Sequence, residues 1–163
     1  MFGLLKKYDV HMCSEVKGRI LLDGNPVYGT QILRDLSYVD DVVVTDETET
    51  DRDGYFSMPA VTITSKKPGD MFVHDVVMQH INVLYDGVTY KLWNTRLLGI
   101  EPFAEVEAKL KSLNGDLANS EVQFTFPNKQ NPNLEFDGES ICRWDNDFEI
   151  FEIVDDGTQF FSS

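Results

Sequence analysis

Histidine and cysteine are the residue types in this chain with the widest chemical scope. His11 and Cys13 lie close together, and a zinc site built on them would need a further ligand from His74, His80 or Cys142. Structural zinc sites, however, use closely spaced pairs of ligands, and a second such pair is missing. We therefore predict no metal or cofactor, with the cysteines buried as small apolar groups and the histidines on the polar surface.

Patterns for nucleophiles and for calcium are also incomplete. Ser14 and Ser140 lie outside any Gly-x-Ser-x-Gly motif, and no glycine-rich phosphate loop occurs. A Cys–His nucleophile would need the two side chains to meet in space, which sequence spacing does not specify. Residues 49–54 resemble part of an EF-hand loop, but Ala60 stands where a bidentate Glu is required. We predict a protein that is not an enzyme, and an unrecognised metal-dependent hydrolase is the catalytic alternative.

Carboxylates are frequent in two stretches of the chain, residues 40–53 and residues 135–156. The sequence has 28 Asp and Glu residues against 14 Lys and Arg, and a formal net charge of −14. Binding to nucleic-acid phosphates depends on basic residues, so we expect no nucleic-acid partner. Such acidity either aids solubility or attracts a basic protein and speeds the encounter with it. The predicted partner-binding residues are Asp40, Asp41, Asp46, Glu47, Glu49, Glu149, Phe151, Glu152, Asp155 and Asp156.

Length and composition indicate a globular protein with a single domain over residues 1–163. Hydrophobic residues make up 42% of the sequence and aromatic residues 12%, enough for a substantial core. No apolar run approaches the roughly 20 residues of a membrane span, and the polar start of the chain does not read as a secretory leader. We therefore expect a cytoplasmic protein without membrane contact, in which Cys13 and Cys142 are reduced rather than joined by a disulfide. The oligomeric state stays open.

Hydrophobic periodicity predicts the elements that position these residues. Residues 16–22 alternate between apolar and polar side chains, which is typical of a half-buried strand. Residues 79–93 alternate on either side of Asp86-Gly87, a strong signal for a two-residue hairpin turn. The stretch 71–78 is compatible with either a short helix or a strand.

One helix is expected, over residues 101–113. Phe103, Val106 and Leu110 recur at intervals of three and four residues and form an apolar stripe. Asn114-Gly115 is the predicted stop signal. Two acid–base pairs at i,i+4 spacing support the helix, Glu105–Lys109 and Glu107–Lys111.

Two turn motifs in the first third of the chain carry a resemblance to a known fold. Asp-Gly-Asn-Pro-Val-Tyr-Gly at residues 23–29 follows the first alternating strand, and Thr-Asp-Arg-Asp-Gly-Tyr-Phe at residues 50–56 suggests a hairpin. Together they resemble the carboxypeptidase regulatory-like, or transthyretin-like, β-sandwich. The resemblance implies a mainly β, antiparallel sandwich of that type, with a core motif over 14–65 and an insertion holding the helix over 99–132. It implies a binding or accessory module rather than a particular activity.

A narrower resemblance covers residues 1–4, 12–16, 90–93 and 133–138. These segments are similar to a small uncharacterised bacterial family of the same fold, and such proteins are often encoded beside secreted toxins. The resemblance implies a cytosolic immunity protein that neutralises a cationic, nuclease-type effector, such as one delivered by a type VI secretion system. The alternative partner role is that of an adaptor or chaperone-like accessory of a secretion system.

Overall fold

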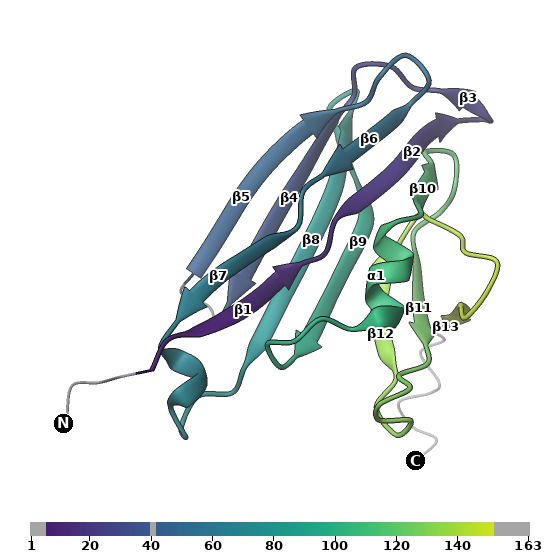
Figure 1. The fold of residues 1–163 in the computed structure, drawn as a ribbon. Coiled ribbons are helices and arrows are strands. Elements are labelled where there is room, and N and C mark those ends of the chain that lie inside the picture. Colours follow the sequence, from purple (N-terminus) through teal and green to yellow (C-terminus); the bar gives the residue numbers. More distant parts are fainter. Residues whose placement is uncertain (1–5, 40–41, 152–163) are drawn as a thin grey trace, which may run out of the picture.

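The computed structural model describes residues 6–39 and 42–151, and these form a mainly β protein with two layers of strands and one α-helix (Figure 1). The larger layer is a seven-stranded sheet in which β13, β11, β12, β9, β8, β4 and β5 lie side by side in that order. Its strands are β13 (Glu149–Phe151), β11 (Val122–Phe126), β12 (Phe136–Ser140), β9 (Val88–Leu98), β8 (Val76–Tyr85), β4 (Gln31–Tyr38) and β5 (Val42–Glu49).

The second layer is made of two strand groups that continue one another. One group pairs β1 (Tyr8–Cys13) with β7 (Val61–Ser65). In the other, β2 (Val16–Leu22) pairs with β3 (Asn25–Pro26), β6 (Tyr55–Met58) and β10 (Leu113–Asp116). Only the β2–β10 pairing is parallel among the described strands. The 3-10 turn η1 (Lys67–Gly69) and the helix α1 (Ala104–Leu110) lie outside the sheets.

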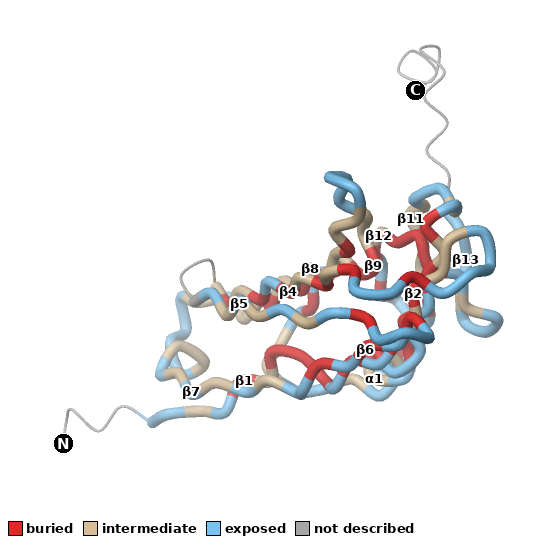
Figure 2. The backbone as a smooth tube through the Cα atoms, turned by 90° about the horizontal axis from the view of Figure 1, so that it is seen from above, coloured by how far each residue is buried: buried red, intermediate tan, exposed pale blue. Residues whose placement is uncertain are grey.

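The core lies between the two layers, as the end-on view in Figure 2 shows. The core consists of side chains at alternate positions along the strands, because every second side chain of a strand points to the same face. Ile32 and Leu36 of β4, for example, are fully buried. At the far end of the core the indole of Trp93 contacts three aromatic rings with centroid distances of 6.0 Å, those of Phe124, Phe126 and Trp144.

The hairpin predicted at Asp86-Gly87 is confirmed. β8 and β9 pair along their length on either side of this turn. Asp86 and Gly87 have φ values of 50° and 74°, the left-handed conformation that a type I′ turn demands at both central residues. The stretch 71–78, which fitted either a helix or a strand, is a turn followed by the first residues of β8.

The hairpin predicted at residues 50–56 is wrong. β5 pairs with β4 in the large sheet, whereas β6 pairs with β2 in the other layer, so the turn carries the chain across the sandwich. Asp51 organises this crossing, because its Oδ1 accepts hydrogen bonds from the backbone N–H groups of Asp53 and Tyr55 at 2.9 Å. The turn is fixed to the second layer by Ile20, whose N–H donates to the Gly54 carbonyl at 2.8 Å.

The predicted helix exists but is shorter than residues 101–113. It ends at Leu110, and Leu113 already belongs to β10. Parallel pairing with β2 extends the chain through Asn114 and Gly115, so tertiary hydrogen bonding replaces the predicted stop signal. The Glu107–Lys111 pair forms at 3.2 Å, but Lys109 is buried and donates instead to the Asn146 carbonyl at 3.2 Å.

Candidate functional site

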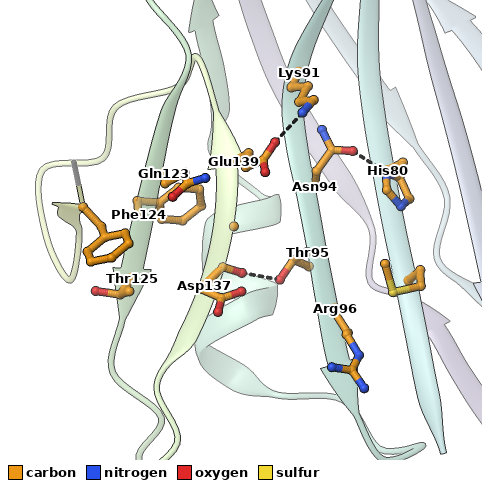
Figure 3. A pocket seen from close by; sticks show the side chains of 13 residues that line it. His80, Lys91, Asn94, Thr95, Arg96, Gln123, Phe124, Thr125, Asp137 and Glu139 are labelled. Carbon is orange, nitrogen blue, oxygen red and sulfur yellow. Dashed lines mark hydrogen bonds and ion pairs between the residues drawn. The ribbon is translucent and has the colours of Figure 1, made fainter. Parts of the chain in front are cut away.

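A groove with a volume of about 590 Å³ lies on the outer face, by which we mean the face of the seven-stranded sheet turned away from the second layer (Figure 3). It crosses β8, β9, β12, β11 and β13. Its lining side chains with polar or aromatic groups are His80, Lys91, Asn94, Thr95, Arg96, Gln123, Phe124, Thr125, Asp137, Glu139 and Phe151.

The groove follows a seam where β9 and β12 are joined by little backbone pairing. Their only ladder pair is Glu139 with Asn94, whereas β8 pairs with β9 over its full length. One further backbone bond runs from the Ile141 N–H to the Lys91 carbonyl at 2.8 Å. Side chains add two more connections: Thr95 Oγ1 donates to the Asp137 carbonyl at 2.6 Å, and Ser140 Oγ donates to the Leu92 carbonyl. The seam therefore depends on side-chain hydrogen bonds to a greater extent than the long ladders between β9, β8, β4 and β5.

A β-bulge in β9 decides which side chains reach the groove. Ile81 pairs with Trp93 and Asn82 pairs with Lys91, so Leu92 is an extra residue in the ladder. Leu92 and Trp93 are both fully buried although they are neighbours in sequence. The extra residue turns Lys91 and Asn94 to the outer face, since a bulge shifts the alternation of the strand.

One ion pair crosses the seam. Lys91 Nζ contacts a carboxylate oxygen of Glu139 and lies 3.3 Å from Glu121 Oε1. The hydrogen bond from Lys91 holds the pKa of Glu139 below its usual value, and the same bond raises the pKa of Lys91. Because these side chains are more than a third exposed, solvent screening keeps the contribution to stability small.

The other side of the groove offers hydrogen-bonding groups without a nucleophile. Asn94 Nδ2 donates to Asn82 Oδ1 at 3.4 Å, and Asn94 Oδ1 accepts from His80 Nδ1. Arg96 is exposed and forms no ion pair within the described residues. The groove therefore contains cationic and anionic side chains together with neutral hydrogen-bond donors and acceptors.

The structure divides the predicted partner-binding residues between opposite edges of the large sheet. Asp46, Glu47 and Glu49 lie on β5, and Glu149 and Phe151 lie on β13, at the other end of the strand order. Of the members of the set that the structure describes, Phe151 alone lines the groove. The remaining members lie outside the described residues: Asp40, Asp41, Glu152, Asp155 and Asp156.

Asp46 differs from its neighbours because its carboxylate is used inside the protein. Arg34, which is 0% exposed, donates to it from Nε at 2.8 Å and from Nη2 at 2.6 Å. Arg34 Nη1 also donates to the Pro59 carbonyl at 2.8 Å, so this guanidinium ties the two layers together. Glu47 and Glu49 are exposed, and Glu47 accepts a hydrogen bond from Gln31 at 2.6 Å.

The histidines and cysteines do not converge. His11 Nε2 lies 3.0 Å from Ser14 Oγ, but neither residue lines the groove. Cys13 and Cys142 are free and buried, and burial raises their pKa to about 11 and about 12, so both are neutral thiols near pH 7. No group of three or more His, Cys, Asp or Glu side chains is placed to hold a metal ion in the parts of the chain that the structure describes.

Sequence reasoning missed most of the groove. Asp137 and Glu139 alternate about Gly138, a pattern that does indicate two carboxylates on one strand face. Gly138 marks the close approach of β12 to β9, since a Cβ there would lie 2.9 Å from the Asn94 carbonyl oxygen. The bulge that exposes Lys91 leaves no such local signal.

Fold and site together define a two-layer β protein with an open sheet face and a polar groove. The chain belongs to a family known as a domain of unknown function, DUF6795, whose model matches residues 16–120. No curated protein and no solved structure matches it. The matched residues include β8 and β9 but end before β11, so the two sides of the groove fall on either side of that boundary.

The comparisons do not test three of the expectations, which stay predictions. These are the resemblance to the transthyretin-like fold family, the link to a toxin-associated family, and the assignment of a core motif to residues 14–65 and an insertion to residues 99–132. Of the described residues, no helix is long and apolar enough to cross a membrane.

Proposed function

We propose that this protein is a non-catalytic binding module, and specifically a cytosolic immunity protein that neutralises a cationic, nuclease-type bacterial toxin. The observation that carries the proposal is the open outer face of the large sheet. Within the described residues, the side chains on this face are half-buried or exposed along β5, β4 and β8, and the second layer covers only the opposite face (Figure 2). A flat surface of this extent suits a protein partner better than a small substrate.

The chemistry of the face also supports a binding role. The groove contains charged groups of both signs and the exposed ring of Phe151, and aromatic side chains are common anchors of interfaces. Both thiols are buried and neutral, so neither is available as a nucleophile. The formal charge of −14 supports attraction to a basic partner, because complementary charge accelerates association.

The proposal is tested by expressing the product of the neighbouring gene in a sensitive bacterium, with and without this protein. An immunity protein restores growth and elutes with the toxin as a complex in size-exclusion chromatography. Complex formation without rescue of growth assigns the adaptor or chaperone-like role instead. The absence of a complex contradicts both partner roles.

A matched pair of variants locates the contact. Asp137→Lys reverses a charge in the groove, whereas Asp9→Lys makes the same change on β1 in the second layer. Both residues are exposed, so both variants should fold. If the toxin binds the outer face, Asp137→Lys weakens the complex and Asp9→Lys does not. Equal effects of the two variants would mean that only net charge matters.

A further inference from the structure

β5 is the longest strand at an edge of the large sheet. It pairs with β4 through all eight of its residues, and no strand lies on its other side within the described part of the chain. The opposite edge strand, β13, has three residues. A strand at an edge presents unpaired N–H and C=O groups, which form a template for another strand.

The hydrogen bonds at the end of β5 show which of its backbone groups are unpaired. The Thr50 N–H donates to the Thr30 carbonyl at 3.0 Å, and the Gly29 N–H donates to the Thr50 carbonyl at 3.0 Å. Thr50 therefore points both groups toward the β4 side. Backbone direction alternates along an antiparallel strand, and this ladder has no bulge. The groups that point to the open edge thus belong to Val43, Thr45, Glu47 and Glu49.

The same residues turn their side chains to the outer face, where they are exposed. Asp35 of β4 lies beside them and accepts a hydrogen bond from Thr45 Oγ1 at 3.0 Å. The only basic residue of β4 and β5 is Arg34, which is buried and paired with Asp46. The exposed charges that these two strands place next to the open edge are therefore all acidic.

This charge selects the kind of strand that can pair with β5. A second copy of the chain would bring a further acidic edge and a further formal charge of −14. A basic strand would instead place Lys or Arg across from Glu47 and Glu49, and opposite charges on directly paired residues are stabilising. A basic occupant is thus favoured over self-association.

We propose that β5 is the docking edge for an extended segment of a basic protein, which adds to the sheet as its next strand. The segment carries Lys or Arg at alternate positions, facing Glu47 and Glu49. Backbone hydrogen bonds to the edge residues provide affinity and the alternating charges provide selectivity, as in other cases of strand addition. The inference deepens the proposed function and rests on it, because it assigns the basic partner to one edge of the sheet.

The test uses ¹⁵N-labelled full-length protein and a synthetic peptide as long as β5 in which Lys and Val alternate. In the free protein, amide exchange should be fast at Val43, Thr45, Glu47 and Glu49 and slow at the residues between them. Peptide binding should slow exchange at these four residues selectively. In an antiparallel pair the Lys residues directly across from Glu47 and Glu49 donate their backbone N–H groups to β5, whereas the Val N–H groups point away. A peptide with N-methylated backbone nitrogens at its Lys positions therefore keeps the charge but loses these donors, and it should bind at least about tenfold more weakly.

Two substitutions provide the control. Thr45→Pro removes an N–H that faces the open edge and leaves the bonds to β4 intact, whereas Thr45→Ala keeps that N–H; both lose the contact with Asp35. Only Thr45→Pro should abolish the alternating protection. Should Thr45→Pro fail to fold, a comparison of Glu47→Lys with Asp9→Lys tests the same edge. Only Glu47→Lys should lower the affinity for the peptide.

Three results would overturn the docking edge. Peptide binding could slow exchange equally at every residue of β5, slow it only in the groove, or leave it unchanged at saturating peptide. Each of these results leaves the toxin-rescue experiment intact, because an immunity protein can bind through the groove. Conversely, alternating protection at β5 together with failure to rescue growth would retain the docking edge and reject the immunity function.

Discussion

The two halves of the seven-stranded sheet are held together in different ways. β5, β4, β8 and β9 are joined by continuous backbone ladders. β12, β11 and β13 are attached to them through one ladder pair and one further backbone bond, from Ile141 to Lys91. The rest of the attachment comes from side chains: the hydrogen bonds of Thr95 and Ser140, the Lys91–Glu139 ion pair and the aromatic packing around Trp93. The first half depends on backbone bonds that most substitutions preserve, whereas the attachment of the second half depends more on individual side chains. The groove lies at the boundary between these two halves, at β9 and β12.

The largest effect is expected for Trp93→Ala. Trp93 is fully buried, contacts Phe124, Phe126 and Trp144, and donates from Nε1 to Gln79 at 2.9 Å. The cavity left by the indole should lower the free energy of unfolding by about 3–5 kcal/mol. Urea denaturation measures the change, with Tyr55→Ala as the exposed aromatic control. A loss below that of the control would mean that aromatic packing does not hold the second half.

Gly138→Ala tests the close contact at the seam. The added Cβ would lie 2.9 Å from the Asn94 carbonyl and 3.1 Å from the Phe124 ring, so β12 must move away from β9. We expect destabilisation by about 1–3 kcal/mol, with faster amide exchange in β12 than in β8. Gly87→Ala, which meets no neighbouring atom but strains a positive φ, provides a control at the hairpin. Equal acceleration of exchange in β8 and β12 would contradict a local seam.

Ser140→Ala removes one of the side-chain bonds across the seam. Ser140 Oγ donates to the Leu92 carbonyl and accepts from the Cys142 N–H at 2.8 Å, and all three residues are buried. Leaving these groups without their partner should cost about 1–3 kcal/mol and loosen β12 before β8. Hydrogen exchange measures the order of opening. Thr45→Ala, which loses an exposed hydroxyl contact, is the matched control.

The smallest effect is expected for Glu139→Gln, which weakens the ion pair with Lys91. The pKa of Glu139 is lowered in the folded state, so its contribution is fully present above the usual carboxyl pKa of about 4.5 and is lost as the pH falls through the lower folded value. Solvent exposure limits the contribution to about 0.2–1 kcal/mol, decreasing with added salt. Thermal unfolding of the two proteins should therefore differ at pH 7 and converge in strong acid. A difference that persists there would indicate a role other than the charge.

Features encoded by neighbouring residues could be predicted from the sequence. The turn at Asp86-Gly87, the alternation of β2 and β8, and the existence of α1 all depend on residues within one element. The expectation of a mainly β fold with one helix is confirmed for the same reason. The exposed acidic character of Glu47 and Glu49 also follows from alternation alone.

Features that depend on a distant strand could not be predicted in this way. The turn at residues 50–56 crosses between layers because Ile20 binds it, and Leu113 extends into β10 because β2 pairs with it. The groove exists because an extra residue at Leu92 redirects Lys91, and that bulge is defined only by the register against β8. Local sequence sets the conformations a segment prefers, but hydrogen bonds and packing between remote segments decide which face, layer and neighbour it finally has.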